Sequence, residues 1–341
     1  MMKVISLVNQ KGGCGKTTTA VNLAYAFAKR GNRTLLIDLD PQAHATFSLG
    51  ITPNLTTADL LEHVIENRPF NPKEFFVWRK DDLSLLPASI GLSALENTIN
   101  RQNNKLEILT KMLMNIDAHF DYCIIDCPPN LGALTLNALV ASSYSVVPLG
   151  ICELSLRGVE NLNSILSMLF EHRKKAPYIL YLITQVDRRF RYSENFYNKV
   201  KEQFRDQLLS TAIRTNIHLR EAAAFGKSVF EYRSDSRGAQ DYKQLAQEIE
   251  SITQRPSLVQ LCLKGMGHNE VYVVGEFNEW RKHRNFQLKK VDDGTWSISL
   301  PLKRGTYRYK FIVDNEWIND PSNSLQENDA FGGKNSILFV R

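Results

Sequence analysis

Short apolar runs alternate with helix-like stretches along most of the chain. The run VISLV is followed by a glycine-rich turn, by the helix-like TTTAVNLAYAFAKRG and by a second apolar run, TLLIDLD. The pattern continues through YCIIDCPP, YSVVPLG and YILYLITQV and ends with DYKQLAQEIESI. Continuous apolar strands separated by helices are typical of a parallel sheet covered on both faces. The pattern therefore predicts an α/β domain with a doubly wound, mostly parallel sheet.

The pattern changes after the segment QRPS at residues 254–257. Alternating segments such as VQLCLKG, EVYVVGEF, TWSISL, TYRYKFIV and SILFV follow, separated by the turn signals DDG, KRG and FGG. Alternation with a period of two predicts half-buried strands. We therefore expect two domains, an α/β domain at residues 1–254 and a compact all-β domain at residues 258–341.

Composition and charge add a few constraints. The 42 Lys and Arg residues exceed the 36 Asp and Glu residues, and the net charge of +6 permits polyanion binding without requiring it. The start MMKVISLVNQ lacks the regions of a signal peptide, and no window reaches the ~18 apolar residues of a membrane span. The five cysteines are scattered and odd in number, which favours reduced thiols. We expect a cytoplasmic protein without a membrane partner.

Two of these cysteines, Cys123 and Cys127, lie four residues apart in YCIIDC. If this segment is a strand, they lie on one face about 13 Å apart, too far to share one metal ion. Because free cysteine is commonly buried, we expect both thiols to pack in the core.

The first apolar run leads through QKGGCGKTT, residues 10–18, directly into a helix-like stretch. Strand, glycine-rich loop and helix in this order are the context in which a P-loop binds phosphates. Glycines let backbone N–H groups approach phosphate oxygens, and the start of the helix attracts anions. Lys16 can reach the terminal phosphates, and the Thr17 hydroxyl can ligate Mg²⁺. We expect ATP and Mg²⁺ as cofactors, with the nucleotide bound by Gly12, Gly13, Cys14, Gly15, Lys16, Thr17 and Thr18.

This loop departs from the ordinary pattern G-x-x-x-x-G-K-[ST], because Gln10 stands at the first glycine and Lys11 follows it. The form K-G-G-x-G-K-T resembles the deviant P-loop of the ParA/MinD family. LLIDLDPQ, IIDCPP, VVPLGICELSLRGVENL and ITQVDRR extend the resemblance over roughly residues 2–252. The resemblance implies a Mg²⁺-dependent ATPase that is a homodimer when ATP is bound. It also implies that Lys11 crosses the dimer interface to contact the partner's ATP.

Carboxylates of two further motifs are candidate catalytic and metal-binding groups. Asp38 and Asp40 alternate in LLIDLDPQ, so we expect them on one face of a strand, facing the nucleotide edge. The resemblance implies that Asp40 orients the attacking water, with Asp38 in support. It also implies that Asp126 of IIDCPP is the Walker B acid, which holds Mg²⁺ through water.

The chain departs from the family's pattern at one place, and two alternative functions compete with the ATPase. The family usually has Gly-Asn after DPQ, where this chain has Ala43-His44, and we expect a local change in helix packing there. A P-loop fold that binds nucleotide without hydrolysis is disfavoured because every carboxylate is present. The iron-sulfur carrier branch of the superfamily is set aside, because Cys123 and Cys127 do not fall at its positions.

Basic residues cluster in the later part of the α/β domain. ParA-like ATP dimers bind DNA without sequence preference through basic residues in this region, and the clusters here comprise Arg188, Arg189, Arg191, Arg214, Arg220, Lys227, Arg233 and Arg237. We expect Arg189, Arg214 and Arg220 to contact DNA phosphates, with solvated surface as the alternative for any one of them. The resemblance also implies nucleoid association and a ParB-like activator. MinD-like members end in a membrane helix, whereas this chain ends in SILFVR.

Residues 258–341 resemble the glycogen-binding module of AMP-activated protein kinase β-subunits. The resemblance is carried by VYVVGEFNEW, GTWSISLPLKRGTYRYKFIVDNEWINDP and FGGKNS. It implies an immunoglobulin-like sandwich of about seven strands. It also implies an α-glucan ligand, because the family's sugar-binding residues match Trp280, Lys310, Trp317 and Asn335. In the family the two tryptophans stack on glucose faces, while the lysine and the asparagine bond hydroxyls.

Two positions of this segment differ from the family's pattern. Phe331 stands where the family often has a leucine, and Gly333 replaces a frequent threonine and so loses one hydroxyl. The alternative for the whole module is that its tryptophans cap the sandwich and that it binds protein, since a fold does not by itself imply a function.

The sequence thus predicts an ATP-dependent dimerising ATPase that partitions or positions cargo, with a carbohydrate-binding-like adaptor at its C-terminus. Two other functions stay open. One is a polysaccharide-sensing regulatory ATPase that does not bind DNA. The other is a plain chromosome or plasmid partition ATPase whose C-terminal domain binds protein.

Overall fold

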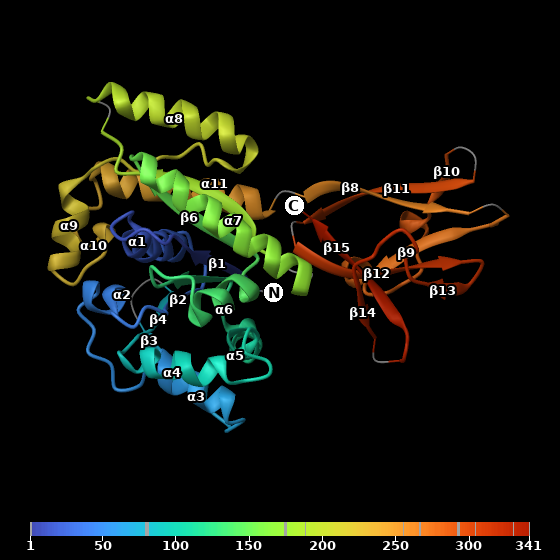
Figure 1. Ribbon diagram of the computed structural model, residues 1–341, viewed down its shortest axis with the longest axis horizontal. Coiled ribbons are helices and arrows are strands. Elements are labelled where there is room, and N and C mark those ends of the chain that lie inside the picture. Colours follow the sequence, from blue (N-terminus) through green and yellow to red (C-terminus); the bar gives the residue numbers. More distant parts are fainter. Residues whose placement is uncertain are drawn as a thin grey trace. The chain divides into compact units, whose positions relative to one another are not determined.

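The computed structural model describes residues 2–78, 82–173, 176–187, 189–254, 256–265, 267–291, 294–303, 305–329 and 331–340. These form two compact units, Met1–Ile249 and Glu250–Arg341, and each unit has its own hydrophobic core (Figure 1). Helix α11 (Arg237–Gln254) continues past this division. We therefore propose residues 1–254 and 258–341 as the domain limits.

The first unit is built on a seven-stranded sheet with the order β3-β4-β2-β5-β1-β6-β7. Its strands are β1 (Lys3–Leu7), β2 (Thr34–Asp38), β3 (Val77–Trp78), β4 (Leu83–Leu86), β5 (Tyr122–Asp126), β6 (Tyr144–Gly150) and β7 (Tyr178–Thr184). Neighbouring strands are parallel except at the edge, where β3 pairs antiparallel with β4. Six parallel strands confirm the predicted sheet.

Helices cover both faces of this sheet. Cys123 and Ile125 of β5 belong to a core shared with α5 and α6, whereas α1 packs against β2 and β5 outside that core. Successive side chains of a strand point to opposite faces, so α1 lies on the other face. The helices are α1 (Lys16–Ala28), α2 (His44–Ser48), α3 (Thr57–Ile65), α4 (Gly91–Asn100), α5 (Ile108–Met114), α6 (Ala133–Ala141), α7 (Glu153–Arg173), α8 (Arg191–Phe204), α9 (Ile217–Ala224), α10 (Val229–Tyr232) and α11, with 3₁₀ turns at Pro72–Glu74, Asp117–His119 and Arg205–Gln207. Within the described ranges, no helix is long and apolar enough to cross a membrane.

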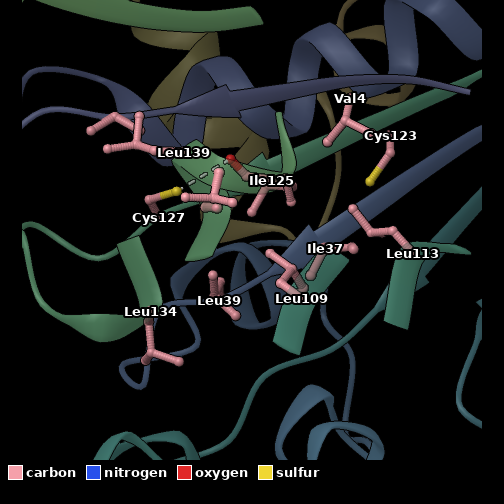
Figure 2. Packing of buried hydrophobic residues seen from close by; sticks show 14 of the residues in the cluster. Val4, Ile37, Leu39, Leu109, Leu113, Cys123, Ile125, Cys127, Leu134 and Leu139 are labelled. Atoms are coloured by element: carbon pink, nitrogen blue, oxygen red, sulfur yellow. Dashed lines mark hydrogen bonds between the residues drawn. The ribbon is translucent and has the colours of Figure 1, made fainter. Parts of the chain in front are cut away.

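The core on the α5 and α6 side encloses both cysteines of the YCIIDC segment. Figure 2 shows Cys123 and Cys127 among aliphatic side chains from the strands and from the two helices, such as Leu109 and Leu139. Cys123 is 0% and Cys127 is 1% exposed. Burial raises the pKa of both thiols well above the usual range. The prediction that these cysteines pack in the core is confirmed.

The second unit consists of two antiparallel sheets, one with the order β10-β11-β8 and one with the order β13-β12-β15-β14, in which β9 also pairs with β12. Side chains from both sheets meet in one core, for example Leu261 and Trp296 from the first sheet and Phe311 from the second. This arrangement confirms the predicted β-sandwich. Its described strands are β8 (Pro256–Lys264), β9 (Val271–Gly275), β10 (Lys289–Lys290), β11 (Thr295–Lys303), β12 (Gly305–Val313), β13 (Glu316–Ile318), β14 (Gln326–Asn328) and β15 (Lys334–Val340), with 3₁₀ turns at Glu276–Asn278 and Arg284–Phe286.

Candidate nucleotide and carbohydrate sites

The glycine-rich loop joins the central strand β1 to α1. β1 lies between β5 and β6, so the loop sits at the carboxyl edge in the middle of the sheet. Gly13 and Gly15 have φ angles of 73° and 89°, a left-handed conformation that glycine adopts without steric cost. Gly15 is the N-cap of α1. The N–H groups of the first helical turn have no partner within the helix, which makes this loop an anion site.

Three side chains hold the loop against the ends of β6 and β7. Gln185 Nε2 donates to the carbonyl of Gly13 at 2.7 Å, and Thr184 Oγ1 donates to that of Cys14 at 2.8 Å. Asn9 Nδ2 donates to the carbonyl of Pro148 at 2.6 Å. These bonds occupy carbonyl groups, whereas among the loop N–H groups that of Lys11 donates to Asn9 Oδ1 at 2.9 Å. The sequence prediction missed these three side chains, although Thr184 and Gln185 belong to the ITQVD segment that it had singled out.

The two predicted lysines make different contacts. Lys16 is 7% exposed, and its Nζ donates to the carbonyl of Lys11 at 3.2 Å across the loop. The Nζ of Lys11 instead donates to the thiol sulfur of Cys152, which follows β6. Burial opposes ionisation of Cys152, but hydrogen bonds with Lys11 and Ser155 outweigh it and lower the pKa of the thiol to about 7. Lys11 is therefore held by its own chain in this structure.

Asp38 and Asp40 do not share one face of a strand, and that expectation was wrong. β2 ends at Asp38, whose carboxylate accepts the backbone N–H of Asp40 at 3.2 Å. The other oxygen of Asp38 accepts the N–H and the hydroxyl of Thr46 at 2.8 and 2.7 Å. Burial raises the pKa of Asp38 to about 6. Asp38 thus joins β2 to α2, while Asp40 accepts the N–H of Gln42 at 2.9 Å.

Asp126 ends β5 in register with Leu7 of β1 and Asp38 of β2. It is 0% exposed, and neither carboxylate oxygen receives a hydrogen bond of ordinary geometry. Burial raises its pKa and the Asp38 carboxylate raises it further, while the nearby Thr17 hydroxyl and the Lys16 ammonium oppose the rise. A buried carboxylate without a partner is costly, and a carboxylate with a hydroxyl suits Mg²⁺. The predicted pair Thr17 and Asp126 therefore fits a magnesium ion.

Two of the arginines predicted to bind DNA are engaged in ion pairs. Arg189 is highly exposed and pairs with Asp187, and its hydrogen bonds lower the pKa of that carboxyl to about 2. Arg214 donates from Nε and Nη2 to the buried carboxylate of Asp241 at 3.0 and 2.6 Å. The partly exposed guanidinium of Arg214 is thus fixed on a buried carboxylate, which favours a structural role.

Arg220 lies on α9 and is exposed to solvent. A β-bridge between Val186 and Arg214 brings the segment after β7 beside the segment that leads into α9. The predicted basic regions are therefore neighbours at this edge of the sheet. Arg188 lies outside the described residues, and the DNA contacts of the other arginines stay predictions.

The second unit gathers the four predicted sugar-binding residues on the outer face of its five-stranded sheet. Tyr309 pairs with Ser336 and both are buried, so their neighbours Lys310 and Asn335 occupy the opposite face. Trp317 of β13 is 52% exposed. Its ring stacks on that of Trp280, with centroids 6.5 Å apart and an angle of 28° between the planes. Residues spread over 56 positions, from 280 to 335, thus meet on one surface.

A residue that the sequence prediction missed, Asp329, lies in the turn between β14 and β15 and reaches this surface through Lys310. Its carboxylate pairs with the ammonium of Lys310 and also accepts the N–H groups of Phe331 and Gly333. The side chain of Phe331 is 97% exposed. An aspartate three residues before Gly332 and Gly333 was a signal for such backbone contacts. The pairing with Lys310, however, depends on which strands lie side by side.

These two units define a P-loop nucleotide-binding domain with a deviant lysine, joined to a β-sandwich of the carbohydrate-module type. Residues 2–177 match the family model described as an AAA domain, and residues 259–341 match that of the glycogen recognition site of AMP-activated protein kinase. The chain belongs to the Soj/ParA family of partition ATPases.

Relatives and solved structures cover the first unit. The sporulation initiation inhibitor protein Soj of Bacillus subtilis is 36% identical over 73% of this chain and 98% of its own length. The chromosome partitioning protein ParA of Myxococcus xanthus is 34% identical over 72% of this chain and 87% of its own length. Cobyrinic acid a,c-diamide synthase from Mycobacterium smegmatis, solved with an ATP analogue and magnesium, is 30% identical with a TM-score of 0.63, covering 74% of this chain and 95% of that one.

Proposed function

We propose that this chain is a Mg²⁺-dependent ATPase that dimerises with ATP, binds DNA without sequence preference and carries an α-glucan on its C-terminal module. The binding and hydrolysis of ATP would then determine whether a glucan-bearing cargo is held on DNA. The single observation that carries the ATPase assignment is the buried, unpartnered carboxylate of Asp126 beside Thr17 and the P-loop. Ionisation of such a buried carboxyl is costly by itself and is favoured when a cation binds beside it.

The residues of the loop divide the chemistry among them. The N–H groups of residues 12–18 bind the phosphates, and Lys16 leaves the Lys11 carbonyl to contact the terminal phosphate. Thr17 would ligate Mg²⁺ and Asp126 would hold it through water, and the ion would supply positive charge beside the phosphate oxygens. Asp40 accepts a hydrogen bond from the attacking water and aligns it with the terminal phosphorus. Asp38 positions Asp40 through the N–H that it accepts.

Dimerisation is proposed to depend on the release of Lys11. Its ammonium contacts Cys152 of its own chain in the structure, and a negative phosphate of a second subunit is a stronger partner for it. A terminal phosphate shared by two subunits stabilises the dimer until it is cleaved, which makes hydrolysis a switch of assembly.

Glucan binding is proposed for the Trp280 and Trp317 rings. The near-parallel rings and the half-exposed Trp317 offer an apolar surface to the C–H face of a sugar, with Lys310 and Asn335 beside them for hydroxyl groups. The match of residues 259–341 to the glycogen recognition site supports the same ligand class.

One experiment tests the whole proposal and separates its alternatives. The full chain is mixed with glycogen and labelled DNA, and glycogen is pelleted with and without ATP and Mg²⁺. We expect DNA in the pellet only when both protein and ATP are present. The Trp280→Ala, Trp317→Ala double variant should release protein and DNA from glycogen, whereas Lys16→Ala should keep protein in the pellet and lose DNA.

The other outcomes favour the other functions. Protein that pellets with glycogen but never carries DNA indicates a polysaccharide-sensing ATPase. Protein that binds DNA with ATP but stays out of the glycogen pellet indicates a plain partition ATPase whose second unit binds protein. The exposed Phe47→Ala variant in the first unit is a matched aromatic control, and it should behave like the unaltered chain.

A further inference from the structure

Asp329 lies in the turn between β14 and β15, at the end of the sheet face that carries Lys310. Its carboxylate is the acceptor for three donors. One oxygen, Oδ1, accepts the N–H of Phe331 at 2.8 Å and the N–H of Gly333 at 2.7 Å, and the other, Oδ2, pairs with the Lys310 ammonium. A backbone bond from Asp329 N to the Gly333 carbonyl at 2.9 Å closes the same turn. One side chain therefore connects the turn to the strand face.

The pair between Lys310 and Asp329 is well shielded from water. The side chain of Lys310 is 15% exposed and that of Asp329 is 9% exposed. Hydrogen bonds from Lys310 and from the two N–H groups lower the pKa of Asp329, so it stays ionised at neutral pH. A lysine has four rotatable bonds and loses much conformational entropy when it is fixed. The pair therefore fixes the ammonium before any ligand arrives.

The turn is shaped around this carboxylate. A Cβ atom at Gly333 would lie 2.8 Å from Asp329 Oδ2 and 3.3 Å from Lys310 Nζ. The first of these distances is shorter than a carbon and an oxygen can tolerate. Glycine at 333 is thus the residue that leaves room for the pair, and the same turn presents the fully exposed ring of Phe331.

We propose that Asp329 is a positioning residue of the glucan site. It holds the Lys310 ammonium and the turn with Phe331 in the positions in which they contact a bound α-glucan. This inference rests on the proposed glucan function of the same surface. Groups fixed in advance lose less entropy on binding, so affinity rises without a new contact to the sugar. Asp329 contributes through Lys310 and Phe331.

The test is calorimetric titration of maltoheptaose, a linear α-1,4-glucan, into the full chain. Asp329→Ser removes the ion pair and leaves only a shorter, weaker hydroxyl acceptor for the two N–H groups, so it should weaken binding about ten-fold. Asp329→Asn keeps an oxygen for the two N–H groups but loses the ion pair, and should weaken binding about three-fold. Gly333→Ala should weaken binding in the unaltered chain and have no further effect in the Asp329→Ser chain, because the crowded carboxylate is then gone.

A double-mutant cycle separates positioning from general stability. If Asp329 acts through the ammonium, Asp329→Asn should have no further effect on affinity in a Lys310→Met chain. Equal losses in both backgrounds would overturn the proposal. Asp121→Asn is the matched control, since Asp121 also accepts a backbone N–H and pairs with an arginine, Arg33, but in the first unit. It should leave the affinity unchanged.

The remaining outcomes distinguish this inference from the function on which it rests. If the unaltered chain fails to bind maltoheptaose, both the glucan function and the role of Asp329 are overturned. If the unaltered chain binds and Asp329→Ser binds equally well, the glucan function stands and the positioning role is wrong. Melting temperatures measured on each variant show whether a loss of affinity accompanies a loss of folding.

Discussion

The nucleotide site of the first unit and the outer face of the second unit differ in whether their charged side chains have partners. Asp126 is buried with neither oxygen hydrogen-bonded, whereas Lys310 is already paired with Asp329. The first arrangement is costly until a cation arrives, and the second is stable by itself. The argument for a ligand is therefore energetic in the first unit. In the second unit it rests on exposed aromatic surface.

The largest effect should come from Lys16→Ala, which removes a charge from the P-loop. Without its ammonium the loop keeps its N–H groups but loses the strongest contact to the terminal phosphates. We expect ATP to bind at least about 100-fold more weakly, measured by titration of a fluorescent ATP analogue. Lys29→Ala, at the other end of α1, is the matched control and should bind normally. Unchanged affinity in Lys16→Ala would contradict the site.

Asp126→Asn should separate function from stability. The variant should lose Mg²⁺-dependent hydrolysis by about 100-fold, because a neutral amide lacks the charge that attracts the hydrated magnesium ion. Without nucleotide and metal it should be more stable than the unaltered chain by about 1 kcal/mol, because a neutral group replaces a buried charge. Phosphate release and a melting temperature raised by roughly 2–4 °C check the two parts.

The same buried acids predict how stability depends on pH. The pKa of Asp38 is about 6 in the folded chain and that of Asp126 is also raised, whereas both titrate near 4 when unfolded. Between about pH 4 and the raised pKa values, the folded state therefore holds more protons than the unfolded state. Its free energy of unfolding without metal should fall as pH rises through about 6. Asp126→Asn should make this fall shallower, and an equal slope in both proteins would contradict the assignment.

Motifs that are contiguous in sequence were predictable, and contacts set by tertiary structure were not. The loop from Gly12 to Thr18 was found because a strand, glycines and a helix follow one another directly. The turn at Asp38 was missed because its partner Thr46 depends on where α2 lies. Asp329 was missed because β14 must pair with β15, and β15 with β12, before it can reach Lys310. A contiguous sequence motif thus identifies a site, whereas strand register and packing determine which side chains contact one another there.

Two of the predicted DNA-binding arginines can be compared within the first unit. Arg214 forms an ion pair with Asp241, whereas Arg220 is exposed on α9. Arg214→Ala leaves the buried Asp241 without its charge partner, so it should lower the free energy of unfolding by about 2 kcal/mol. Arg220→Ala on the surface of α9 should change stability by less than about 0.5 kcal/mol. It should instead weaken ATP-dependent DNA binding and reduce the salt slope by about 1. Denaturant unfolding and DNA titration at several salt concentrations measure these effects.

The outcome for Arg189 sharpens that comparison. Its pair with Asp187 is on the surface and screened by water, so its loss should cost little stability. If Arg214→Ala weakens DNA binding without destabilising the chain, the structural role assigned to it is wrong. If Arg220→Ala leaves the salt slope unchanged, α9 is not part of the DNA surface.

The smallest effect concerns the contact between Lys11 and Cys152. Only the thiolate of a cysteine reacts with iodoacetamide, so alkylation of Cys152 should have its midpoint near pH 7. Lys11→Met removes a hydrogen bond that favours the thiolate and should move the midpoint upward, slowing the reaction at pH 7 several-fold. Exposed Cys262 in the second unit is an internal control, and peptide mapping reports both thiols.

If ATP draws Lys11 toward a second subunit, ATP should shift the Cys152 midpoint in the same direction, and Lys16→Ala should abolish that shift.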